Sequence, residues 1–103
     1  ITVCDAQGII LYMNRKAVKV LVGEGPSVLG KNVLDCHPEP ARSKLAEMLK
    51  NQNSNSYTIE KNGIKKLIHQ SPWYQNGRYM GFVELSIEIP LQMAHFVRKP
   101  KQT

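Results

Sequence analysis

The sequence predicts an α+β domain in which one antiparallel sheet of five strands carries short helices on one face. Two observations support this: the β-type segments fall into an early and a late group with the helical segments between them, and tight turns join the late segments. A doubly wound parallel sheet is excluded, because it needs strands and helices that alternate along the chain. A chain of 103 residues suffices for one domain with one core.

The early strands are expected to form a hairpin. Residues 1–4 are β-prone, residues 5–8 form a turn cluster, and residues 9–13 are a second apolar run. Asn14 is a suitable N-cap for a short helix that ends at Gly23. The apolar residues of that helix share one face, and they are Ala17, Val18, Leu21 and Val22.

A longer helix is expected after residue 35. Asp35 or His37 is expected to cap it, and prolines at positions 38 and 40 are tolerated in a first turn whose amides are unpaired. One apolar stripe repeats at helical spacing, and it consists of Ala41, Leu45, Met48 and Leu49. The polar residues 51–56 are expected to form a loop.

Three strands are expected to complete the sheet, over residues 57–60, 64–74 and 79–89. Asn62-Gly63 and Asn76-Gly77 are the residue choice of tight hairpin turns, and Pro90 ends the last strand. The last strand alternates with a period of two, so its odd positions, Val83 among them, are expected to face the helices. Its even positions are then expected on the opposite face.

The formal net charge of +6 is spread thinly over the chain. Three of the basic residues, Arg98, Lys99 and Lys101, lie close together near the end, so a solvated surface with a basic tail is preferred to nucleic-acid binding. Residues 1–90 are expected to form the domain. Residues 91–103 are expected to be the start of a linker helix or a basic tail.

The composition indicates a cytoplasmic segment of a longer protein. No apolar run approaches the ~20 residues that cross a bilayer, and the segment begins in a strand without an initiator Met. The two cysteines, Cys4 and Cys36, have no spacing typical of a disulfide scaffold, so reduced thiols are expected. The spacing of the histidines and cysteines likewise predicts no metal site.

Four pieces of the sequence, in this order, resemble a PAS domain. They are Val3 to Asn14 with its Asp, Gly and capping Asn, the Leu-Gly-Lys segment at 29–31, the Cys-His-Pro segment at 36–38, and the final hairpin from Asn76 to Glu84. The Cys-His-Pro segment is similar to that of one PAS subgroup. The chain departs from the common pattern at Glu88-Ile89-Pro90, where many members have Asp-Ile-Thr.

The resemblance implies a sensory and interaction module of a larger signalling protein, such as a two-component kinase, a cyclase or a transcription regulator. It implies helices that cup over the sheet and, in members that bind one, a small-molecule cavity. Haem or flavin is possible as a cofactor and neither is required. The domain itself is not expected to be an enzyme, although a catalytic output domain can lie elsewhere in the full-length chain.

The candidate ligand-binding residues follow from side-chain chemistry and expected position. His37 can ligate haem iron or only cap a helix, and Cys36 beside it can react as a redox sensor or as a nucleophile. His69 faces either the cavity or solvent. The full set is Tyr12, Cys36, His37, Leu67, His69, Tyr79 and Val83.

An apolar outer face of the sheet is expected to form a homodimer interface. Met80 and Phe82 are assigned to that face, and Trp73 is expected to join them. The alternative to ligand sensing is a ligand-free PAS-type dimerisation module.

Overall fold

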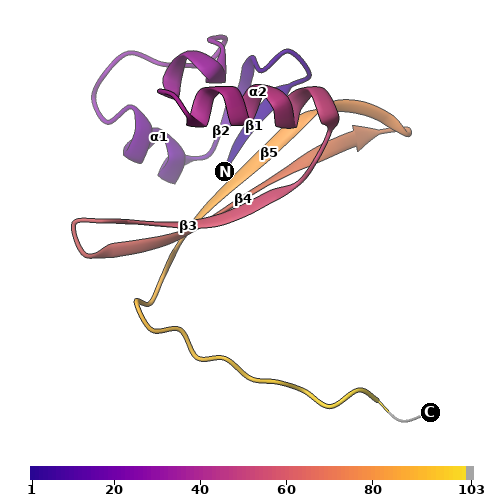
Figure 1. Ribbon diagram of the computed structural model, residues 1–103. Coiled ribbons are helices and arrows are strands. Elements are labelled where there is room, and N and C mark those ends of the chain that lie inside the picture. The colour runs from indigo at the N-terminus through magenta and orange to yellow at the C-terminus, as the bar shows by residue number, and fades with distance from the viewer. Residues whose placement is uncertain (102–103) are drawn as a thin grey trace.

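The five strands form one antiparallel sheet, and the helices lie over one of its faces (Figure 1). This arrangement comes from a computed structural model that describes residues 1–101. The strand order is β2-β1-β5-β4-β3, so β5 is the central strand. The predicted fold class is confirmed. The elements are β1 (Thr2–Asp5), β2 (Ile10–Met13), α1 (Arg15–Leu21), η1 (Val33–Cys36), α2 (Ala41–Asn51), β3 (Asn55–Lys61), β4 (Ile64–Gln75) and β5 (Arg78–Ile89).

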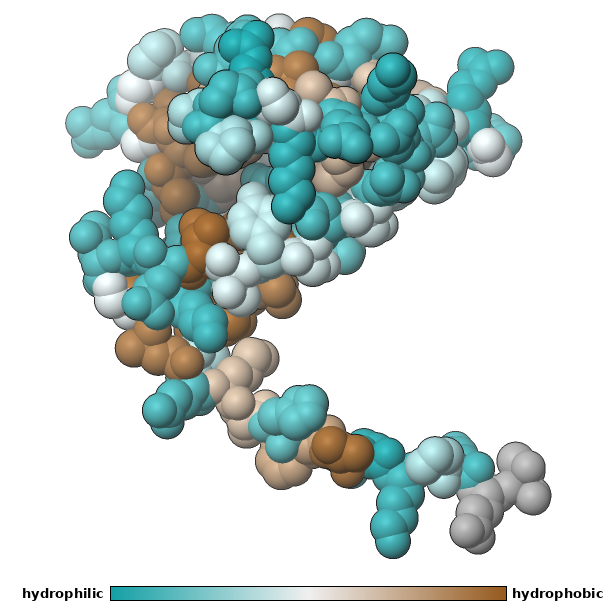
Figure 2. Space-filling view, viewed as in Figure 1, coloured by the Kyte–Doolittle hydropathy of each residue, from teal (hydrophilic) through white to brown (hydrophobic). Residues whose placement is uncertain are grey.

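The chain after Pro90 extends away from the sheet (Figures 1 and 2). Residues 91–101 contain no helix, so the linker helix that the sequence allowed is not formed. A helix of that length is marginal in water unless it packs on another element, and the apolar side chains of this tail, such as Phe96, lie in solvent. Residues 102–103 of the expected tail lie outside the described residues. No helix in residues 1–101 is long and apolar enough to cross a membrane.

The two late hairpins close through the turns that the sequence predicts. Both central residues of each turn have positive φ, 53° and 77° at Asn62-Gly63 and 52° and 76° at Asn76-Gly77. This is the backbone of a type I′ turn, whose twist matches that of the flanking strands. The turns fix β3, β4 and β5 as consecutive antiparallel strands.

Side-chain oxygens organise the early segment. The Asp5 Oδ1 accepts hydrogen bonds from the amides of Gln7 and Ile9, both at 2.9 Å, which shapes the turn between β1 and β2. The Asn14 Oδ1 accepts from the Ala17 amide at 3.0 Å, so the predicted N-cap of α1 is confirmed.

The start of α2 differs from the prediction. The helix begins at Ala41, and neither Asp35 nor His37 caps it; Pro40 occupies the N-cap position without a side-chain hydrogen bond. Asp35 and His37 belong instead to η1, where His37 is the C-cap residue. The 3₁₀ helix ends at Cys36 and a separate turn follows at residues 39–40, so the α-helix starts only after the second proline.

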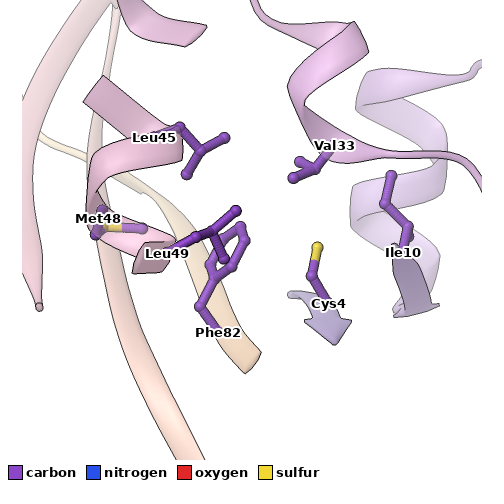
Figure 3. Close-up of a cluster of buried hydrophobic side chains, with 7 residues drawn as sticks. All are labelled: Cys4, Ile10, Val33, Leu45, Met48, Leu49 and Phe82. Atoms are coloured by element: carbon purple, nitrogen blue, oxygen red, sulfur yellow. The ribbon is translucent and has the colours of Figure 1, made fainter. Parts of the chain in front are cut away.

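The core lies between α2, η1 and the centre of the sheet (Figure 3). Phe82 of β5 is 3% exposed and points at α2, whose Leu45, Met48 and Leu49 cover it. Cys4 of β1 lies beside it and is fully buried. The assignment of Phe82 to the outer face is therefore wrong. The complete cluster is Cys4, Ile10, Val33, Leu45, Met48, Leu49 and Phe82.

A β-bulge in β5 explains the wrong assignment. Trp73 pairs with Gly81 but its neighbour Tyr74 pairs with Tyr79, so Met80 is an extra residue on β5. Tyr79 still faces the helices, because its hydroxyl donates to the Leu49 carbonyl at 3.2 Å. Because Met80 is extra, the side chains of β5 after the bulge face the opposite way from that expected when odd and even positions are counted from Tyr79. The even positions, Phe82 to Glu88, face the helices and the odd ones face outward.

Candidate ligand-binding cavity

A cavity of about 220 Å³ lies between α1 and the helix-facing side of the sheet. Hydrophobic side chains are visible around the hollow between the helical layer and the β3–β4 hairpin (Figure 2). The cavity lies beside the core cluster, in the region that α2 does not cover. Its lining comprises Ile1, Thr2, Lys16, Ala17, Val20, Leu21, His37, Tyr57, Ile59, Lys66, Ile68, Glu84, Ser86 and Glu88.

Helix α1 forms an apolar roof over this cavity. Ala17, Val20 and Leu21 line it, yet no residue of α1 is buried. A helix whose apolar face is left partly exposed has space beneath it that a ligand can fill. The cavity thus exists because α1 does not pack closely against the sheet.

The floor of the cavity is more polar than its roof. Glu84 on β5 accepts a hydrogen bond from the Gln70 Nε2 of β4 at 2.7 Å, and the Gln70 Oε1 accepts from the Asn55 Nδ2 of β3 at 3.5 Å. Gln70 is only 4% exposed, so this chain of hydrogen bonds crosses three strands in a largely buried layer. The chain holds the Glu84 carboxylate at a fixed place in the floor.

An ion pair joins roof and floor at the solvent-exposed side of the cavity. The Lys16 Nζ of α1 lies 3.4 Å from the Glu88 Oε1 of β5. Both side chains are largely exposed, so the pair contributes little stability. Its significance is positional, since it connects the roof to the end of the central strand.

His37 lies in the wall between this cavity and a second one. Its Nδ1 is 2.8 Å from the Val33 carbonyl oxygen. A carbonyl can only accept, so Nδ1 carries the proton and, in the neutral ring, Nε2 keeps its lone pair. The second, more open cavity has a volume of about 410 Å³ and lies along α2, between Lys44 and Gln70.

Tyr57 of β3 also lines both cavities. Partial burial raises the pKa of its hydroxyl above the usual value of 10.0, and the negative charge of Glu84 raises it further. The phenol therefore stays protonated in the neutral range and can donate a hydrogen bond to a ligand or accept one. His37 and Tyr57 are the two aromatic groups that separate the two volumes.

The structure brings only part of the predicted set to the cavity. His37 lines it. Tyr79 faces the helices but bonds the Leu49 carbonyl and does not line the cavity. Cys36 is exposed at the end of η1, before α2 begins at Ala41, and it does not line the cavity.

The remaining predicted residues lie on the outer face of the sheet. Cross-strand partners share a face, and Ile68 and Gln70 of β4 face inward, so their neighbours Leu67 and His69 face outward. Val83 faces outward for the same reason, and so does Tyr12, which pairs with Val3. The ring of His69 instead bonds Ser56 at 2.6 Å.

Sequence reasoning misses the polar floor. Simple alternation assigns Glu84, Ser86 and Glu88 to the outer face, because it takes no account of the bulge. One signal is present in the sequence: Gly81 interrupts the strand, and an isolated glycine within a strand indicates a bulge or a close backbone approach. Gly81 has a φ of 141°, and a Cβ there would collide with the Cys4 carbonyl and with Asp5 of β1.

The outer face carries a largely apolar surface, interrupted by His69 and Ser71 of β4, and we call its apolar residues the outer patch. It is centred on β5, and no other element of residues 1–101 forms a layer over it. The indole of Trp73 belongs to it and crosses β5 at Gly81 to donate to the Cys4 carbonyl at 3.0 Å. Met80 is half-buried at the bulge. The outer patch consists of Val3, Tyr12, Leu67, Trp73, Val83, Leu85 and Ile87.

Comparisons of sequence identify no relatives. No family model matches this chain, and no curated protein matches it. The predicted likeness to the Cys-His-Pro subgroup of PAS domains therefore stays a prediction.

Comparisons of structure identify several similar proteins. A domain of an HTR-like protein from Haloarcula marismortui matches 86% of this chain and 95% of its own, with 14% identity and a TM-score of 0.59. The Aer2 receptor from Vibrio cholerae, described as a dual PAS-heme oxygen sensor, matches 86% of this chain and 92% of its own, with 20% identity and a TM-score of 0.61.

The sensor region of a sensor histidine kinase is also similar, with 16% identity and a TM-score of 0.63 over 84% of this chain. The match covers 38% of that longer chain. At these identities the likeness concerns the fold. The chain therefore has a PAS-like fold, one that sensor regions of signalling proteins share.

Proposed function

We propose that residues 1–90 form a PAS-like sensory domain of a larger signalling or transcription-regulating protein. The domain binds a small molecule in the cavity beneath α1 and passes the change to an output domain in the same chain. The observation that carries this proposal is the composition of the cavity floor. It is formed in part by β5, the strand that ends where the chain leaves the sheet.

Glu88 supports the coupling between cavity and exit. It lines the cavity, pairs with Lys16 of α1, and directly precedes Ile89, the last residue of β5. A ligand that moves α1 changes this pair at the point where the tail begins. Such a ligand transmits a signal only if it binds the two arrangements with different affinity.

The volume of the cavity favours a ligand smaller than haem or flavin. The His37 ring, with Nδ1 hydrogen-bonded to the Val33 carbonyl, is arranged as metal-binding histidines commonly are. The cavity of about 220 Å³, however, lies below the ~300–1,000 Å³ of pockets that enclose drug-sized ligands. Haem or flavin would fit only if Tyr57 and His37 moved apart and joined the two cavities.

A cavity-filling substitution tests the proposal. Ala17→Phe adds a ring beneath α1, whereas Ala94→Phe adds the same ring to the exposed tail. Native mass spectrometry of protein purified from its own host is expected to show a bound small molecule in the parent and in Ala94→Phe, and none in Ala17→Phe. A bound molecule that survives in Ala17→Phe, or an apo mass for all three proteins, would contradict ligand sensing in this cavity.

The second candidate function, a homodimer through the outer patch, rests on the uncharged, apolar character of that surface. Its members belong to the central strand β5 and its neighbours, so a second copy related by a two-fold axis could stack face to face on it. The absence of charge in the patch favours a like surface over a charged partner. A ligand-free dimerisation module would use this face alone.

Two isoleucines of equal exposure test the interface. Ile87 in the outer patch and Ile64 at the tip of the β3–β4 hairpin are both 48% exposed. Ile87→Glu is expected to convert a dimer to a monomer in sedimentation, whereas Ile64→Glu is not. A dimer that persists in Ile87→Glu, or a parent protein that is monomeric, would exclude this contact.

The enzymatic alternative receives no support from the described residues. Within residues 1–101, no hydrogen bond joins Cys36 to His37, and a nucleophile–base dyad requires one. Reaction of the exposed Cys36 thiol with oxidants stays a prediction, as does the cytoplasmic location.

A further inference from the structure

The Glu84 carboxylate is a half-buried charge without a cationic partner among residues 1–101. Its cross-strand neighbours, Gln70 and Thr2, are neutral and only 4% and 5% exposed. The two ion pairs of these residues lie elsewhere, at Lys16–Glu88 and Arg42–Asp35. Although the chain has a net charge of +6, the neighbours of Glu84 on the two adjacent strands are therefore neutral.

The hydrogen bonds of the floor keep Glu84 an acceptor. Asn55 donates to Gln70, and Gln70 in turn donates its Nε2–H to Glu84. An ionised carboxylate has about four acceptor sites, and this amide occupies one of them. Because Glu84 lines the cavity, acceptor capacity remains available to a molecule inside it.

The lysine in the floor does not neutralise Glu84. Lys66 faces Glu88 across the sheet, and Glu88 lies four residues from Glu84 along β5, a backbone separation of roughly 13 Å. The cross-strand pair between Lys66–Glu88 and Gln70–Glu84 is Ile68–Ser86, and both of its residues are uncharged. The two ends of the floor therefore differ: the end at Glu84 is negative, and the end at Lys66 and Lys16 has one more positive than negative charge.

We propose, on the basis of the sensory function proposed above, that the cavity selects a ligand with a hydrogen-bond donor head group, a protonated amine by preference. The head group binds Glu84, in place of the missing counter-ion. The rest of the ligand is small and apolar, because Ala17, Val20 and Ile68 surround it within about 220 Å³. A carboxylate head group is disfavoured at this end, because its negative charge would lie beside the like charge of Glu84.

Three probes of equal length and different head groups test the selection. n-Butylammonium, n-butanol and n-butyrate are titrated into the parent protein and followed by amide chemical shifts. n-Butylammonium is expected to bind the most tightly. In Glu84→Gln, which keeps an acceptor for Gln70 but removes the charge, its advantage over n-butanol is expected to fall about 10- to 100-fold.

Glu60→Gln is the matched control, because Glu60 is an exposed residue on the outer side of β3. It is expected to bind all three probes like the parent, and unfolding in urea verifies that Glu84→Gln is folded. Equal binding of the amine by parent and Glu84→Gln, preference for n-butyrate, or no binding of any probe overturns the inference. If n-butanol or n-butyrate binds at least as tightly as n-butylammonium and Ala17→Phe abolishes that binding, the sensory cavity stands and only the head-group selection fails.

Discussion

Replacement of Gly81 tests the bulge that decides which side chains face the cavity. An alanine Cβ at this position would overlap the Cys4 carbonyl oxygen and would lie 2.5 Å from the carbonyl carbon of Asp5. Both are backbone atoms of β1, so relief requires the two strands to separate. The backbone itself has a φ of 141°, which side chains other than glycine's rarely adopt.

The expected cost combines these two effects. Overpacking costs about 1–3 kcal/mol, and a backbone conformation of this kind costs about 1–3 kcal/mol more. Gly81→Ala should therefore lower the free energy of unfolding by about 2–6 kcal/mol, a large part of the ~5–15 kcal/mol that stabilises a typical domain. Urea denaturation, followed by the fluorescence of Trp73, measures this loss as a lower midpoint.

Gly63→Ala is the control for backbone strain alone. Gly63 has a φ of 77°, but no atom lies within 4 Å of the place that an alanine Cβ would occupy, so its replacement should cost only about 1 kcal/mol. If Gly81→Ala proves no more costly than Gly63→Ala, the close approach of β1 to β5 is wrong. The inward placement of Phe82 and Glu84 would then lose its explanation.

Three further outcomes follow from the packing, the helix cap and the buried thiol. Phe82→Ala should lower the free energy of unfolding, measured in urea, by about 3–5 kcal/mol, because Phe82 is 3% exposed and lies in the core. A loss below about 1 kcal/mol would mean that Phe82 is not a core residue. Asn14→Ala should cost about 1 kcal/mol by removing the cap of α1, and it should weaken binding in the cavity, since α1 is the roof; unchanged stability and affinity would refute both roles. Burial, with the charges of Glu84 and Asp5, raises the pKa of the Cys4 thiol from 9.0 to about 12, so Cys36 alone should react with a thiol reagent in the native protein. The pKa of this thiol is higher in the native state than in the unfolded state, so its contribution to stability is complete below pH 9 and is lost as the pH rises toward 12. Cys4→Ala should remove that part of the pH dependence of stability.

The candidate site is predictable from the sequence only in part. His37 can be found because a histidine beside a proline-rich helix start is conspicuous in the sequence, and the structure places it in the cavity wall. Glu84 and Gln70 cannot be found in this way. Each belongs to a strand whose face is decided by pairing with β1 or β5, and the residues that set that pairing are distant in sequence.

The fold class can be predicted from the sequence because it depends on local interactions. The Asn-Gly turns, the Asn14 cap and the alternation within each strand depend on residues a few positions apart, and these determine the number, order and type of the elements. The early strands are also correctly predicted, since the Asp5 turn is built from its own neighbours.

Contacts between distant segments decide which side chains of the sheet face the core and the cavity and which face outward. The sequence by itself determined five antiparallel strands with helices on one face, because turns and caps are local. Only the tertiary structure decided that Phe82 is core, that Glu84 lies in a cavity floor and that the odd positions from Val83 onward face outward. The physical reason is the bulge at Met80, next to the close approach of β1 to Gly81, because one extra residue in β5 exchanges the two faces of the strand.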